Sequence, residues 1–182
     1  MKLHDALILE FIKPDPYGIP TGKIIQMVGD AQINIECETT ELKQERARRS
    51  IETIVDYVTP DLTVRRKRVS EGQEPVVAIE LETDEAYDFA ESMRQIKRYR
   101  KITPDVRIII PYNYRDFATL YYKEGFPVWL WNGKRRYECL RCKNITDIEG
   151  PYEIKCEHCK KYLKHRLLGV VDVNFIDYTS TI

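Results

Sequence analysis

Long apolar runs are missing from this chain of 182 residues. No stretch approaches the roughly 20 apolar residues that a helix needs to cross a bilayer, so no membrane-spanning segment and no membrane partner are predicted. The first residues, which include His4 and Asp5, lack the basic and apolar blocks of a secretory signal. We therefore expect an intracellular, cytoplasmic location.

An excess of either charge is also missing, because 29 Lys and Arg balance 29 Asp and Glu. Taken over the whole chain, this balance gives no sign of a nucleic-acid partner. The two halves differ: residues 1–93 hold 11 basic and 19 acidic residues (net −8), and residues 94–182 hold 18 and 10 (net +8). A basic half can follow phosphates while an acidic half holds metal ions, although an interface between copies of the chain is an alternative use of the same separation.

Cysteine is scarce, with five in the chain, but four of them follow one pattern. Cys139-x-x-Cys142 and Cys156-x-x-Cys159 form two knuckles separated by thirteen residues. Paired knuckles allow four thiolates to surround a Zn²⁺ ion, with two disulfides as the alternative. We predict a zinc ribbon at residues 134–166, whose zinc is structural because four thiolates leave no open coordination position.

The remaining chain, residues 1–133 with 167–182, has the length of one ordinary core. Residues 6–12 are apolar and compatible with a strand, and residues 41–58 have apolar positions at helical spacing. Strands and helices then alternate, which predicts an α/β core with at least one parallel connection. The other expected strands are residues 22–28, 31–39, 62–69, 75–82, 106–111, 127–131 and 167–178, and the other helices begin at residue 83 or 84 and at residue 114.

Three acidic residues are predicted to meet where two paired strands end. Glu80 and Glu82 share a face because side chains alternate along a strand. If the preceding strand pairs as a hairpin centred near Gly72, Asp61 lies opposite Thr83 to within a residue or two, at the same end as both glutamates.

Such a cluster has the chemistry of a magnesium site. Mg²⁺ takes oxygen ligands and favours one or two carboxylates together with water and phosphate. Asp61, Glu80 and the main-chain carbonyl of Leu81 provide that set. Phosphodiester hydrolysis needs a divalent metal to neutralise the phosphate and to position water, so the cluster suits metal-assisted cleavage.

The next helix carries polar residues on one flank. Ser92, Gln95 and Tyr99 recur at helical spacing beside an apolar stripe. Lys97 falls on the other flank, about 160° from Gln95 at ~100° per residue. We therefore expect Gln95 and Tyr99, and not Lys97, to accompany the carboxylates.

The order of these residues resembles that of a known family, the PD-(D/E)XK nuclease superfamily. The shared order is Pro60-Asp61, eighteen residues, Glu80-Leu81-Glu82, and then a helix with Gln95-x-x-x-Tyr99. The Gln-x-x-x-Tyr signature is similar to that of the RecB-like branch. The resemblance covers residues 41–131, and Glu45-Arg46 resembles a Glu-Arg pair of archaeal Holliday-junction resolvases.

This resemblance implies a restriction-endonuclease-like fold, in which helices flank a mixed central sheet, and an endonuclease that uses Mg²⁺ or Mn²⁺. By resemblance, Asp61 and Glu80 bind the metal, Glu45 completes its shell through water, and Gln95 and Tyr99 position the substrate strand. DNA is the expected substrate, with RNA as the alternative. A homodimer is a further possibility, because two strands need two cuts.

One position departs from the family pattern, because Glu82 stands where the family has the lysine that polarises the attacking water. Glu82 is then a candidate general base or a ligand of a second metal. The alternative is an inactive nuclease fold that binds nucleic acid or regulates another protein. A second Glu-x-Glu at residues 36–38 is a weaker candidate for the active strand, because no Pro-Asp precedes it.

Basic and aromatic residues extend the predicted contact with nucleic acid. Tyr112 and Tyr122 are candidates for stacking on bases or for the core, and both tryptophans are expected in the core. The basic residues predicted to contact phosphates are Arg65, Arg66, Arg68, Arg98, Lys134, Arg135, Arg136, Lys160 and Lys161.

Overall fold

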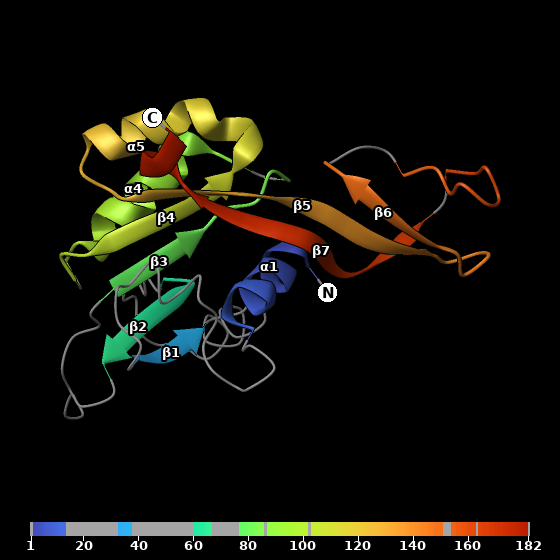
Figure 1. Ribbon diagram of the computed structural model, residues 1–182, viewed down its shortest axis with the longest axis horizontal. Coiled ribbons are helices and arrows are strands. Elements are labelled where there is room, and N and C mark those ends of the chain that lie inside the picture. The colour runs from blue at the N-terminus through green and yellow to red at the C-terminus, as the bar shows by residue number, and fades with distance from the viewer. Residues whose placement is uncertain are drawn as a thin grey trace, which may run out of the picture.

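The computed structural model describes residues 2–13, 33–37, 60–66, 77–85, 87–101, 103–150, 154–162 and 164–181. Within these ranges the chain is an α/β protein with one mixed sheet of seven strands (Figure 1). The elements are α1 (Leu3–Ile12), β1 (Ile33–Cys37), β2 (Leu62–Arg66), β3 (Val77–Leu81), α4 (Phe89–Tyr99), β4 (Val106–Pro111), η1 (Tyr112–Tyr114), α5 (Arg115–Lys123), β5 (Val128–Cys139), β6 (Ile145–Glu149), β7 (His165–Asp177) and η2 (Tyr178–Thr181). The strand expected at residues 22–28 and the helix expected at 41–58 lie outside the described residues.

The sheet order is β1-β2-β3-β4-β5, and both β6 and β7 pair with β5. The pairs β1–β2 and β2–β3 are antiparallel, whereas β3–β4 and β4–β5 are parallel, so the predicted parallel connection is confirmed. The β2–β3 register differs from the expected one. Leu62 pairs with Ile79, which places Asp61 beside Glu80, three positions from the expected partner Thr83.

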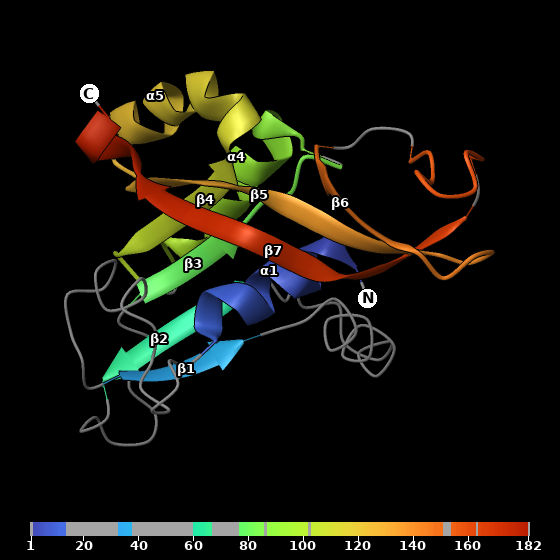
Figure 2. The same cartoon turned by 45° about the vertical axis from the view of Figure 1, so that its right-hand side comes forward.

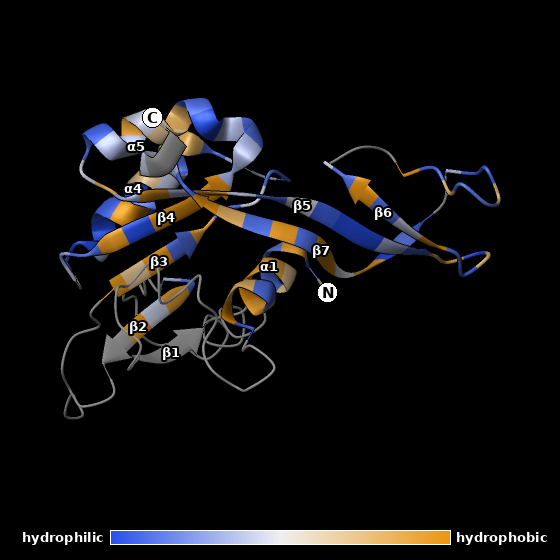
Figure 3. Ribbon diagram, viewed as in Figure 1, coloured by the Kyte–Doolittle hydropathy of each residue, from blue (hydrophilic) through white to orange (hydrophobic). Residues whose placement is uncertain are grey.

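Apolar side chains pack on both faces of the sheet. Figures 1 and 2 show α4 and α5 on one side of it and α1 on the other. Val77, Ile79 and Leu81 belong to the core cluster that contains α1 and β7, while Ala78 belongs to the cluster beneath α4 and α5. Glu80 lies two residues after Ala78, so its side chain is on the same face of β3 and faces α4. Figure 3 shows that β3 and β4 are largely hydrophobic, as buried strands are.

The N-terminal apolar segment is a helix, so the prediction of a strand at residues 6–12 is wrong. Leu3, Leu7, Ile8 and Phe11 are buried, and their spacing places them on one helical face. This face packs against β7, where the ring of Phe11 meets the edge of Phe175 at a centroid distance of 4.8 Å. A short apolar run does not distinguish a buried helix from a strand by periodicity alone.

Helix α4 begins at Phe89, later than the expected start at residue 83 or 84. Asp88 caps it, because its side chain accepts hydrogen bonds from the backbone N–H groups of Ala90 and Glu91, at 2.9 and 3.1 Å. Lys97 lies on the exposed flank and forms an ion pair with Glu124 at 2.7 Å, as its helical phase predicts.

Strands β5 and β7 extend beyond the core as one long antiparallel ribbon, to which β6 adds a third strand (Figures 1 and 2). Both strands run without a break through the boundaries expected for the zinc ribbon at residues 134 and 166.

Trp129 and Trp131 at the core end of β5 are buried, as expected. No helix among the described residues is long and apolar enough to cross a membrane.

Candidate functional site

Asp61 and Glu80 are brought together by strand pairing. Asp61 immediately precedes β2, and its Oδ2 accepts a hydrogen bond of 2.8 Å from the backbone N–H of Leu81. The backbone N–H of Asp61 points in turn at Glu80 Oε2, at 3.4 Å. The two residues are only 0% and 5% exposed. Two carboxylates in one buried cluster need compensating groups, because desolvation disfavours each charge.

Helix α4 provides two of these groups. Gln95 Nε2 donates to Glu80 Oε1 at 2.7 Å, and the Tyr99 hydroxyl donates to Glu80 Oε2 at 2.9 Å. Gln95 Nε2 also lies 2.7 Å from the Tyr99 hydroxyl, because residues four apart are neighbours on a helix. Burial, and then the negative charge of Glu80, raise the pKa of Tyr99 far above its ordinary value. Tyr99 therefore stays protonated and acts as a donor.

His4 joins the cluster from α1, and the sequence interpretation missed it. Its Nε2 lies 3.0 Å from Asp61 Oδ2, and its Nδ1 lies 3.4 Å from Asp5 Oδ1. The sequence predicts a strand over residues 6–12, which leaves His4 outside the element, whereas the helix over Leu3–Ile12 includes His4 and brings its side chain to Asp61. The helical spacing of Leu3, Leu7 and Phe11 was the signal that could have found it.

A cavity of about 280 Å³ opens beside the cluster. His4, Ser92 and Gln95 contribute to its wall, but most of its charged lining is acidic. The lining carboxylates are Asp61, Glu80, Glu82, Asp88 and Glu91, and the described residues of the wall include no Lys or Arg. Such a concentration of carboxylates attracts cations, and oxygen donors suit a hard divalent cation such as Mg²⁺.

Glu82, the residue that departs from the family pattern, lies in the wall of this cavity. Its backbone is held by Trp131, a residue of the core cluster that contains α1, whose Nε1 donates to the Glu82 carbonyl oxygen at 2.8 Å. Glu45 and Arg68 lie outside the described residues, as do the side chains of Arg65 and Arg66.

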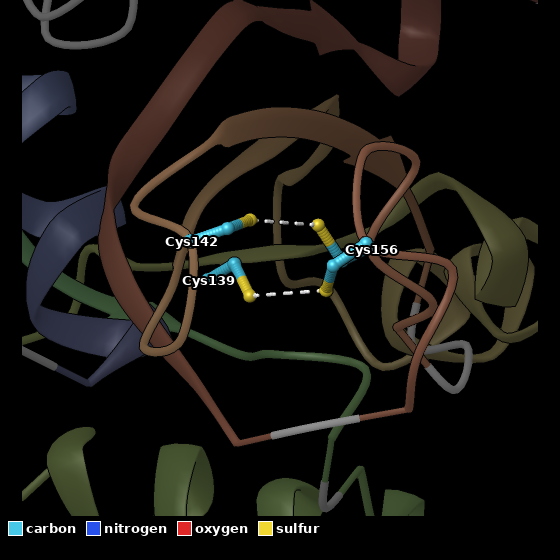
Figure 4. A group of neighbouring side chains, drawn as sticks. Cys139, Cys142 and Cys156 are labelled. Carbon is cyan, nitrogen blue, oxygen red and sulfur yellow. Dashed lines mark hydrogen bonds between the residues drawn. The ribbon is translucent and has the colours of Figure 1, made fainter.

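Four cysteines form a second cluster at the end of the ribbon (Figure 4). Their Sγ atoms all lie within 4.8 Å of one another. The two sulfur pairs drawn in Figure 4 are 3.9 Å apart for Cys139 and Cys159 and 3.4 Å apart for Cys142 and Cys156. Sulfurs bound at ~2.3 Å to one tetrahedral Zn²⁺ lie about 3.8 Å apart, so the cluster can hold a metal ion and is compatible with structural zinc.

The two cysteine knuckles share one backbone geometry. Lys143 and Lys160, each next after the second cysteine of its knuckle, have positive φ angles of 63° and 56°. Their backbone N–H groups donate to the carbonyls of Cys139 and Cys156, at 2.9 and 2.8 Å. The turns direct backbone N–H groups at sulfur: the N–H of Cys159, followed by the Cys142 thiol and the N–H of His158, lowers the pKa of Cys156 to about 6. A thiolate, the form that binds metal, is thereby favoured.

The basic residues of the ribbon have different environments. Lys160 and Lys161 are exposed near its tip, and Arg98 is exposed on α4. Lys134 pairs with Asp172 at 3.1 Å, and Arg136 forms two hydrogen bonds with Asp147, at 2.8 and 2.7 Å. Arg135 does not lie on the surface: its side chain is 2% exposed and forms an ion pair with Asp84.

Comparison of the chain with protein-family models, with curated proteins and with solved structures finds no match. The chemistry of the carboxylate cluster and of the cysteine cluster is therefore the basis for assigning a function.

Proposed function

We propose that this protein is a metal-dependent nuclease that hydrolyses phosphodiester bonds in DNA. The observation that carries the proposal is the hydrogen-bonded group of Asp61, Glu80, Gln95 and Tyr99 beside an acidic cavity. Buried carboxylates whose oxygens are oriented by an amide and a hydroxyl form a rigid set of ligands.

Asp61, Glu80 and the carbonyl of Leu81 would hold the metal ion, which would neutralise the scissile phosphate and favour the attack of water. Gln95 and Tyr99 fix the rotamer of Glu80, and His4 fixes Asp61. Glu82 borders the same cavity and is the candidate to accept the proton of the attacking water. Glu45 remains a candidate ligand through water, by resemblance to the nuclease family.

The order of elements supports a restriction-endonuclease-like core. The antiparallel pair β2–β3 carries the acids, α4 carries Gln95 and Tyr99, and the parallel strands β4 and β5 follow, with α5 between them. The cysteine cluster, filled with structural zinc, would stiffen the end of the ribbon. There, exposed Tyr162 lies near Lys155, whose Nζ is 5.7 Å from the ring centroid, and this pair suits contact with bases and phosphates.

A second candidate function is a nuclease fold that binds nucleic acid without cutting it. The observation that favours it is the position of Glu82, where the family has its catalytic lysine, together with the lack of Lys and Arg among the described residues of the cavity wall. On this view the zinc ribbon carries the binding, and the acidic cavity would take up a cation without turnover.

Incubation with labelled single-stranded, duplex and branched DNA, and with RNA, in Mg²⁺ or Mn²⁺ distinguishes the two candidates. We expect cleavage that EDTA stops and that Glu80→Ala abolishes. Glu124→Gln, which removes a carboxylate from the exposed pair with Lys97, is the matched control and should cleave normally. Salt-dependent binding without cleavage in either metal would establish the second candidate.

A further inference from the structure

A second, larger cavity of about 450 Å³ lies where the ribbon leaves the core. It shares no lining residue with the carboxylate cavity, yet the two are lined by consecutive residues of one segment, Thr83 and Asp84. Its volume falls within the ~300–1,000 Å³ range of small-ligand sites. A ligand there would lie next to the proposed catalytic site.

The backbone is irregular at this cavity. The β5–β7 register shifts between Asn132 and Lys134, and Asp172 on the partner strand has a φ of 53°. Gly133 permits this bulge, because a Cβ atom there would meet Val173 Cγ2 at 3.0 Å and Val173 Cα at 3.2 Å. A bulge redirects side chains from the regular alternation of a sheet, and bulges are frequent beside binding sites.

Arg135, in the cavity wall, has unused hydrogen-bond donors. Its Nη2 pairs with Asp84, but Nε and Nη1 have no hydrogen-bond partner within the described part of the chain. Its side chain is 98% buried, with 2% exposed. Buried guanidinium N–H groups need acceptors, so the geometry favours a ligand with acceptor oxygens, such as a phosphate or a base carbonyl.

The other lining groups favour a base over a bare anion. Asn113, Asn132 and Asn174 present amides that both donate and accept, and Tyr112, 36% exposed, offers a ring for stacking. The lining carries three carboxylates against two cations, and Lys134 is already paired with Asp172. A highly charged anion is therefore disfavoured.

We propose that this cavity binds one unpaired nucleotide of the substrate strand, with its base at Tyr112 and the asparagine amides and an acceptor oxygen toward Arg135. The inference rests on the proposed function, because it gives the nuclease a site for a nucleotide next to the scissile phosphate. Substrates with a single-stranded or splayed segment would then be preferred over continuous duplex.

Calorimetric titration of the zinc-loaded, full-length Glu80→Gln protein without Mg²⁺ tests the inference. The probes are dAMP, dTMP and inorganic phosphate. We expect saturable binding of the nucleotides, at least about tenfold tighter than binding of phosphate. Tyr112→Ala and Asn132→Ala, at exposed positions in the wall, should each weaken nucleotide binding about tenfold. Leu120→Ala, at a 43% exposed residue on α5 outside the cavity, is the matched control and should change nothing.

The inference is overturned if neither nucleotide saturates the protein, if phosphate binds as tightly as dAMP, or if Tyr112→Ala and Asn132→Ala bind dAMP like the parent. Arg135→Lys should also weaken binding, and the two exposed variants decide the matter if it does not fold. Cleavage without nucleotide binding would overturn this inference alone, whereas nucleotide binding without cleavage would overturn the proposed function alone.

Discussion

The hydroxyl of Tyr99 is the group whose removal tests the carboxylate cluster with the least disturbance. Tyr99→Phe keeps the buried ring but removes the donor to Glu80 Oε2 at 2.9 Å. A hydrogen bond to a charged group contributes about 1.5–3 kcal/mol, so we expect the free energy of unfolding at pH 7 to fall by about that amount. Tyr121→Phe is the matched control, because its equally buried ring bonds to neutral groups, such as the Tyr87 hydroxyl at 3.0 Å.

Urea unfolding at pH 7 is the assay, and the control should lose about 0.5–1.5 kcal/mol, the value for a neutral pair. The pH dependence adds a second test. The pKa of Tyr99 is raised on folding, so its contribution is fully present below the unfolded value of ~10 and is lost as pH rises above it. Wild type should therefore lose more stability above pH ~10 than Tyr99→Phe does. Equal losses in the Tyr99 and Tyr121 variants at pH 7 would refute the idea that Tyr99 supports an ionised Glu80.

Three further substitutions test the ribbon and its junction with the core. Asp84→Asn leaves Arg135 buried without its carboxylate, and should cost about 3–5 kcal/mol in urea unfolding; a cost below ~1 kcal/mol would show that the pair is not buried in solution. Gly133→Ala forces a Cβ atom against Val173 and should lower the free energy of unfolding by about 1–3 kcal/mol. A urea midpoint equal to that of wild type would contradict this and show that the bulge relaxes. Cys156→Ser should lower bound zinc from one per chain toward none by elemental analysis, and retention of a full equivalent would contradict the four-thiolate site.

Sequence patterns predicted the parts of the site that depend on local periodicity. Alternation in β3 predicted that Glu80 lies on the face opposite Val77, Ile79 and Leu81. Helical phase predicted that Gln95 and Tyr99 lie together and that Lys97 lies away from the carboxylates. The cysteine spacing likewise predicted the cluster that the ribbon brings together. These features need only the geometry of one strand, one helix or one turn.

Features that depend on contacts distant in sequence were not predicted. His4 reaches Asp61 only because the N-terminal segment is a helix, and an apolar run of that length fits either element. The burial of Arg135 depends on Asp84, a partner fifty-one residues away in the sequence. The sequence pattern alone therefore predicted that Arg135 is exposed and contacts phosphates. The β2–β3 register depends on which residues belong to the two strands and which to the connection between them, and local periodicity does not decide this.

The central claim is that Glu80 supports metal-dependent hydrolysis of a phosphodiester bond, and a single-turnover cleavage rate tests it most directly. Wild type, Glu80→Gln and the control Glu124→Gln would be compared on one labelled DNA across a Mg²⁺ titration. Loss of a carboxylate ligand removes several kcal/mol of transition-state stabilisation, so Glu80→Gln should be at least about 100-fold slower. The Glu124→Gln rate should equal that of wild type. Equal rates for wild type and Glu80→Gln at every Mg²⁺ concentration would contradict the claim.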